Sequence, residues 1–148
     1  MKNFLMTLIS ALMAFSCTVN IPQKDVSYKS AKKYFVKNSA DYKDVTEKII
    51  TSQDEFDHVF GAATTMGVNG KPTPIDFSKE NVIALIYPET NLEVEIIPVS
   101  LQETGQNIVY SYKVIKGGQR SFMTIPNTII IIQKPNSKKI IFHKIKEQ

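Results

Sequence analysis

Few residues in this sequence have the types and the spacing that catalysis or metal binding requires. The chain has two histidines, His58 and His143, and one cysteine, Cys17. A zinc site needs three or four convergent ligands, but the sequence contains no HxH, HExxH or CxxC spacing and no GxSxG motif of serine hydrolases. The sequence therefore predicts no catalytic residue, no metal site and no cofactor, and it favours a protein that is not an enzyme.

Cys17 stands where an apolar N-terminal segment ends. The uncharged run from Phe4 to Ala14 is shorter than the roughly 20 residues that span a bilayer, and it has the length of a secretory signal. The Ala-Phe-Ser-Cys sequence at 14–17 resembles the lipobox of bacterial lipoproteins, in which the cysteine is acylated and becomes the first mature residue. An ordinary cleavage after Ser16 that leaves Cys17 unmodified is the alternative.

The lipobox resemblance implies a signal peptide over residues 1–16 and a membrane anchor on Cys17. We then expect an exported protein of the cell envelope, lipid-anchored to a bacterial membrane and most readily to the outer membrane. Several acyl chains hold a protein firmly where a single chain holds it only marginally.

The segment KGGQRSF, residues 116–122, is the candidate partner-binding element. Gly117 and Gly118 permit backbone angles that other residues avoid, so we expect a loop that joins two strands and projects from the domain. Arg120, the only arginine of the chain, has a planar set of donors that fits a partner's carboxylate. A plain hairpin with a solvated arginine is the alternative.

Two other groups of side chains share a strand face. Glu93 and Glu95 lie on one outer face, as catalytic carboxylates or ordinary solvated residues do. Tyr110, Tyr112 and Phe142 are candidates to line the mouth of a curled sheet, although such tyrosines also serve as packing residues. They keep open an alternative function, a carrier or sensor of a small molecule or glycan.

The charge of the chain argues against nucleic acid as a partner. The formal net charge is +4 at pH 7, and the lysines are spread along the sequence. A nucleic-acid binder normally has a clustered basic face. Export to the envelope points the same way.

The elements that must position these residues are mostly strands. Ser52 and Glu55 form a capping box, and the apolar residues from Phe56 to Ala63 recur at helical spacing, which predicts one short helix over residues 53–62 with His58 facing solvent. Pro98 marks an edge or a bulge. Apolar runs predict strands at 45–52, 81–88, 91–103, 105–118, about 128–133 and 139–146, with 81–88 buried on both faces and the last two joined as a hairpin.

These elements predict one domain behind a tether. Residues 17–30 are polar and cannot bury enough surface to fold alone, so we interpret them as a lipid-anchored tether. Residues 31–148 then form a single globular α+β domain, with a mainly antiparallel sheet or half-barrel and one short early helix.

Two stretches resemble the C-terminal domain of PrcB, a subunit of a bacterial protease complex. The stretch IITSQDEFDHVFG carries Glu55 and Phe56 on a short helix, and PIDFSKENVIALIY carries Asp76 and Phe77 before a central apolar strand. With Pro126 before the closing strands, the resemblance covers roughly residues 47–145. It implies a non-catalytic domain that binds an envelope protease as an accessory subunit or inhibitor.

Overall fold

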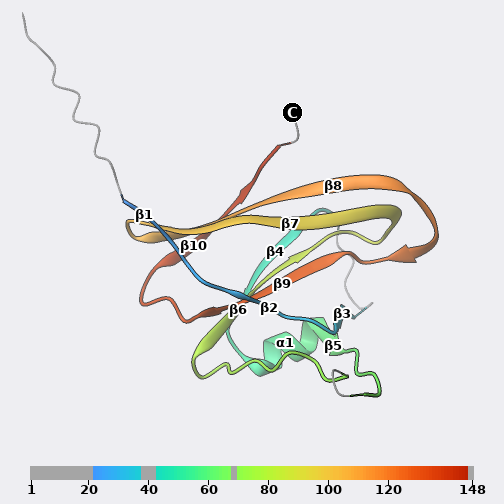
Figure 1. Ribbon diagram of the computed structural model, residues 1–148, viewed down its shortest axis with the longest axis horizontal. Helices are drawn as coiled ribbons and strands as arrows, with labels where there is room; N and C mark the ends of the chain where they lie inside the picture. The colour runs from blue at the N-terminus through green and yellow to red at the C-terminus, as the bar shows by residue number, and fades with distance from the viewer. Residues whose placement is uncertain (1–21, 38–42, 68–69, 147–148) are drawn as a thin grey trace, which may run out of the picture.

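The computed structural model describes residues 22–37, 43–67 and 70–146 and arranges them in three layers (Figure 1). One outer layer is a sheet with the strand order β1-β7-β8-β10, and the middle layer is a sheet with the order β2-β9-β6-β4. The other outer layer holds a helix and the pair β3-β5. We call the two larger sheets the outer sheet and the middle sheet.

The elements have the following bounds. The outer sheet contains β1 (Gln23–Asp25), β7 (Thr90–Thr104), β8 (Asn107–Thr124) and β10 (Lys139–Lys144). The middle sheet contains β2 (Lys29–Ser30), β4 (Thr46–Ile50), β6 (Glu80–Ile86) and β9 (Asn127–Gln133). The third layer contains β3 (Tyr34–Val36), α1 (Gln53–Val59) and β5 (Phe60–Ala62).

The middle sheet is buried on both faces, which explains the continuous apolar runs of its two central strands. Every residue of β6 is buried. Because side chains alternate along a strand, Ile83 and Leu85 pack in one core cluster with the outer sheet, while Val82 and Ile86 pack in a second cluster with α1. The prediction of a central strand buried on both faces is confirmed.

The short helix begins at the predicted place and ends earlier than predicted. The Ser52 hydroxyl accepts a hydrogen bond from the Glu55 N–H at 3.3 Å, and the Glu55 carboxylate accepts one from the Thr51 N–H at 3.2 Å, as in a capping box. The helix stops at Val59 because Phe60 is extended and pairs with β3. Phe60 remains buried, but it reaches the core from a strand.

The predicted fold class, α+β with mainly antiparallel sheets and one short early helix, is confirmed. The strands form separate sheets that do not close into a barrel. The predicted closing hairpin is wrong, because β10 crosses to the outer sheet and pairs in parallel with β8. Both edges of β9 are already occupied, by β2 and β6, so β10 has no place beside β9.

The tether was predicted to extend to residue 30, and this boundary is wrong. β1 pairs with β7, β2 pairs with β9, and the Val26 N–H donates to the Leu101 carbonyl at 2.8 Å. Backbone hydrogen bonds at two sheet edges therefore hold this polar segment, which needs little apolar burial of its own. Residues 1–21, with the predicted signal peptide and Cys17, lie outside the described residues.

Candidate functional site

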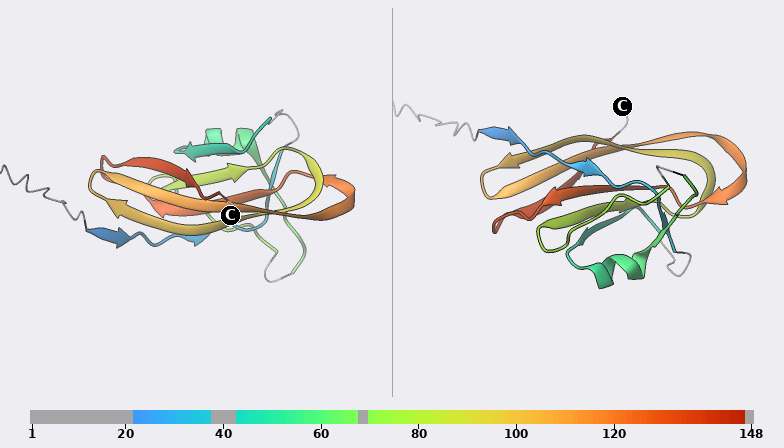
Figure 2. Two further views of the ribbon diagram at one scale, coloured as in Figure 1. Left: turned by 90° about the horizontal axis from the view of Figure 1, so that it is seen from above. Right: turned by 60° about the horizontal axis from the view of Figure 1, so that its bottom comes forward.

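The strands β7 and β8 continue well past the strands that flank them. β1 pairs with β7 only at residues 102–104, and β10 pairs with β8 only at residues 107–112. Residues 90–97 of β7 and 113–124 of β8 form a two-stranded extension, which bends around one end of the molecule (Figure 2). We call these residues the ribbon.

Irregular pairing gives the ribbon its bend. Residues 120–123 of β8 stand opposite Asn91 alone on β7, and such bulges curve a strand. On the side toward the middle sheet, the Thr128 hydroxyl donates to the Ile96 carbonyl at 2.8 Å. The Lys116 Nζ lies 5.8 Å from the centre of the Tyr87 ring. The ribbon is thus fastened on its inner side, and its outer face is open.

The segment predicted to be a projecting loop lies within this ribbon, so the predicted geometry is wrong. Gly117 and Gly118 belong to β8 and neither has a positive φ. The turn between β7 and β8 is made elsewhere, at Gly105 with φ 58°. The glycine at position 117 is better explained by a close contact than by backbone conformation. A Cβ there would lie 3.2 Å from both Cβ and Oε2 of Glu93.

Arg120 binds within the ribbon. Its Nη2 donates to Oε1 of Glu93 at 2.9 Å, and its guanidinium carbon lies 5.8 Å from the centre of the Phe122 ring. Both side chains of the ion pair are exposed. Arg120 was predicted to bind a carboxylate of a partner, but its guanidinium already forms an ion pair with Glu93 of the same chain.

A hollow of about 400 Å³ opens on the outer face of the ribbon. Glu93 and Glu95 bring two carboxylates to it, and Arg120 compensates the first of them. Within the described part of the chain, Glu95 makes no ion pair or side-chain hydrogen bond. The hollow is lined by Glu93, Val94, Glu95, Ile115, Gly117 and Arg120.

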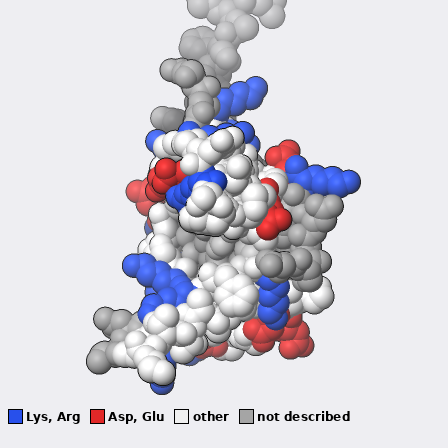
Figure 3. Space-filling model, turned by 90° about the vertical axis from the view of Figure 1, so that its right-hand side faces the viewer, with Lys and Arg blue, Asp and Glu red and all other residues white. Residues whose placement is uncertain are grey.

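Exposed apolar side chains gather on the same ribbon. Phe122 is 57% exposed, Met123 is 55% exposed and Ile115 is 38% exposed. Figure 3 views this end of the molecule and shows uncharged surface interspersed with charged side chains of both signs. Phe122 was included in the predicted loop without a role of its own, and Met123 was not considered, because the prediction depended on the two glycines and Arg120. The only sequence feature that could have indicated them is that two large apolar residues stand side by side.

The two histidines do not come together in one site. His58 is exposed on α1, as predicted. His143 is exposed on β10, where its Nδ1 lies 3.4 Å from the Ser111 hydroxyl. The two histidines belong to opposite outer layers of the fold. Across the described ranges, no group of three or more His, Cys, Asp or Glu side chains is arranged to hold a metal ion.

The aromatic residues considered as a ligand patch pack in the core. Tyr110 and Tyr112 are fully buried between the outer and middle sheets, and Phe142 packs against them. Burial is the main reason that the pKa of each tyrosine is raised well above its ordinary value. The Tyr112 hydroxyl donates to Glu47 at 2.7 Å. These rings do not line the hollow on the ribbon.

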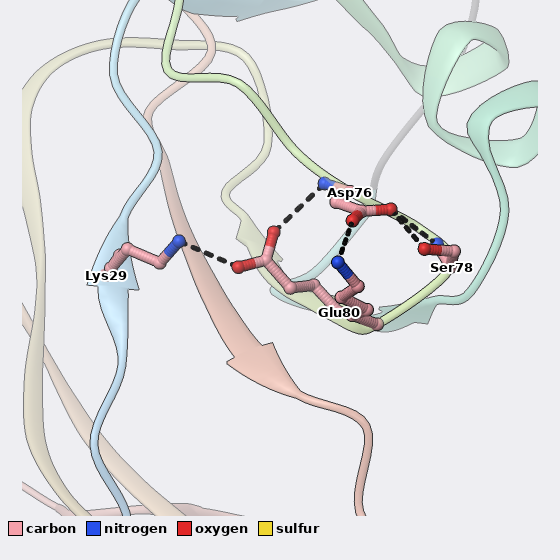
Figure 4. Close-up of polar contacts among 5 residues, drawn as sticks. Lys29, Asp76, Ser78 and Glu80 are labelled. Carbon is pink, nitrogen blue, oxygen red and sulfur yellow. Dashed lines mark hydrogen bonds and ion pairs between the residues drawn. The ribbon is translucent and has the colours of Figure 1, made fainter.

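A polar cluster at the start of β6 fastens the N-terminal segment (Figure 4). The Glu80 carboxylate accepts hydrogen bonds from the Lys29 ammonium at 2.7 Å and from the Asp76 N–H at 3.0 Å. The Asp76 carboxylate accepts hydrogen bonds from the Ser78 N–H and hydroxyl, as in an Asx turn. These hydrogen bonds lower the pKa of both carboxyl groups. Both carboxylates are hydrogen-bonded within the chain, which indicates a structural role for the cluster.

The comparisons leave the resemblance to PrcB as a prediction. No family model matches the chain, and the comparisons with curated proteins and with solved structures found no match. In the ranges that the structure describes, no helix is long and apolar enough to cross a membrane. Conclusions about function therefore depend on the geometry of the ribbon and on the sequence around Cys17.

Proposed function

We propose that this chain is a lipoprotein of the bacterial cell envelope whose single β-rich domain binds a protein partner without catalysis. The resemblance to PrcB suggests an envelope protease as the partner, with this chain as an accessory subunit or inhibitor. The ribbon is the proposed contact surface.

One observation carries the proposal: the ribbon exposes Ile115, Phe122 and Met123 within a short stretch of β8. Grouped apolar side chains on a surface are typical of interaction sites. Aromatic residues, methionine and arginine are also the residue types enriched in protein interfaces. Phe122, Met123 and Arg120 supply all three types.

Site-specific photocrosslinking in living bacteria tests the contact surface. A photoreactive phenylalanine analogue at Phe122 should give a discrete crosslinked product of higher mass, which mass spectrometry identifies. The matched control places the analogue at Met66, which is fully exposed in a loop outside the ribbon. Absence of a product from position 122, or the same product from both positions, would contradict the proposal.

The lipid anchor has its own test, because it depends on Cys17 alone. Metabolic labelling with a palmitate analogue should mark the wild-type chain, and Cys17→Ser should abolish the label. The variant should leave the membrane fraction or accumulate as precursor. Label retained by the Cys17→Ser chain would rule out acylation at this position.

A further inference from the structure

The outer face of the ribbon combines a hollow, uncompensated negative charge and apolar walls. Glu95 brings a carboxylate that makes no ion pair among the described residues, in a chain whose net charge is +4. Directly opposite on β8 stands Ile115, whose half-exposed side chain lines the same hollow. The chemistry that fits both is a side chain with an apolar stem and a cationic head.

We propose that this hollow receives a lysine or arginine side chain of the protein partner, with neighbouring apolar residues of the partner on Phe122 and Met123. This inference rests on the proposed function and names the chemistry of the partner's contact. A lysine stem packs on apolar surface while its ammonium reaches a polar group. Here the stem lies along Ile115 and the ammonium meets Glu95.

Gly117 and Arg120 have opposite effects on how available the Glu93 carboxylate is to such a side chain. Gly117 has no side chain, so the Glu93 carboxylate fits closely over it and stays beside the hollow. Arg120 holds that carboxylate at 2.9 Å. Arg120 is thus an internal competitor for a partner's cation, the opposite of the carboxylate anchor that its sequence context predicted.

The position of the ribbon favours a protein occupant over a lipid surface. The described chain begins beside the β7–β8 turn, where β1 pairs with residues 102–104, whereas the ribbon bends around the other end (Figure 1). An N-terminal anchor therefore attaches at the end opposite the ribbon. Net negative charge in the hollow also disfavours an anionic membrane.

A peptide titration of the full chain, purified as the bacterial host processes it, tests the inference. The probe is the blocked tripeptide acetyl-Leu-Lys-Leu-amide, and its matched control carries glutamine in place of lysine. In ¹H–¹⁵N NMR spectra, the lysine peptide should shift the amide signals of Glu95, Ile115 and Gly117 at millimolar concentration. The glutamine peptide should bind about fivefold more weakly, the size expected for one exposed ion pair.

Two variants give opposite predictions. Glu95→Gln should reduce binding of the lysine peptide about fivefold, and Arg120→Ala should increase it because Glu93 becomes available. Equal binding of the two peptides, unchanged binding by Glu95→Gln, shifts outside the ribbon or no shift at all would overturn the inference. Such a failure differs from failure of the proposed function, since photocrosslinking from Phe122 is measured independently of the peptide.

Discussion

Replacing Lys29 by methionine tests whether residues 22–30 belong to the domain. The variant keeps a long apolar stem but removes the ammonium that lies 2.7 Å from Oε1 of Glu80. The Lys29 side chain is 62% exposed, whereas that of Glu80 is only 7% exposed. The change therefore leaves a buried carboxylate with one remaining side-chain hydrogen bond, from the Asp76 N–H.

The expected loss lies between two limits. An exposed ion pair contributes about 0–1 kcal/mol, and breaking a fully buried one costs about 3–5 kcal/mol. This pair has one exposed and one buried partner, so Lys29→Met should lower the free energy of unfolding by about 1–2 kcal/mol at neutral pH. Lys71→Met, at an exposed lysine of a loop, is the matched control and should change it by less than about 0.5 kcal/mol.

The loss should depend on pH in a definite direction. The Asp76 N–H first, and then Lys29, lower the pKa of Glu80 below its ordinary value of 4.5. A carboxyl group with a lowered pKa in the folded state stabilises it above its unfolded pKa, and this contribution disappears as the pH falls through the folded pKa. The difference between wild type and Lys29→Met should therefore shrink below pH 4.5.

Urea unfolding followed by circular dichroism measures both effects, since guanidinium is itself a salt and screens ion pairs. Unfolding curves are compared at neutral and acid pH for wild type, Lys29→Met and Lys71→Met. If Lys29→Met is as stable as wild type at neutral pH, the Lys29–Glu80 ion pair does not help to hold residues 22–30 on the domain. A loss that stays constant into acid would show that the Glu80 charge is not its cause.

Three core positions give further expected outcomes in the same unfolding assay. Phe56→Ala should lower the free energy of unfolding by about 3–5 kcal/mol, because the Phe56 ring is 1% exposed and contacts other aromatic rings. His58→Ala, on the exposed face of α1, should lower it by less than about 0.5 kcal/mol. Equal losses for the two variants would mean that the buried and exposed faces of α1 are misassigned. Tyr112→Phe should cost about 0.5–1.5 kcal/mol through its lost bond to Glu47. Tyr110→Phe should be neutral or stabilising, because the buried Tyr110 hydroxyl has no hydrogen-bond partner among the described residues; a comparable loss there would contradict this explanation.

Local periodicity predicted the elements whose burial is set by their own sequence. The alternation of Leu92, Val94 and Ile96 with Glu93 and Glu95 identified an amphipathic strand, and β7 has that pattern of exposure. Pro98 was predicted to mark an edge or a bulge, and the pairing of β7 with β8 shifts between Pro98 and Ser100. In each case the signal and its cause lie within a few residues.

Features that depend on distant pairing could not be predicted in this way. β1 and β2 are short and polar, and only the free edges of β7 and β9 make them strands. The parallel placement of β10 depends on β2 already occupying the edge of β9. The sequences of β1 and β2 do not indicate that β7 and β9 have free edges with which they pair.

The ribbon depends on both local periodicity and distant strand pairing. For this reason the sequence identified residues of the candidate site but predicted a loop where the structure has a strand. Gly117, Gly118 and Arg120 do lie at a surface that is open on one side, but glycine was taken as a sign of a turn. In the structure, β7 provides a partner strand as far as Thr90, so β8 continues through the glycines to Thr124. Gly117 then has a steric role, because the Glu93 side chain occupies the space that a Cβ would need. A Cβ at this position would lie 3.2 Å from the Glu93 side chain, so Glu93 would have to shift by a few tenths of an ångström beside Arg120. Gly117 therefore links the backbone of the ribbon to the position of the Glu93 carboxylate at the hollow.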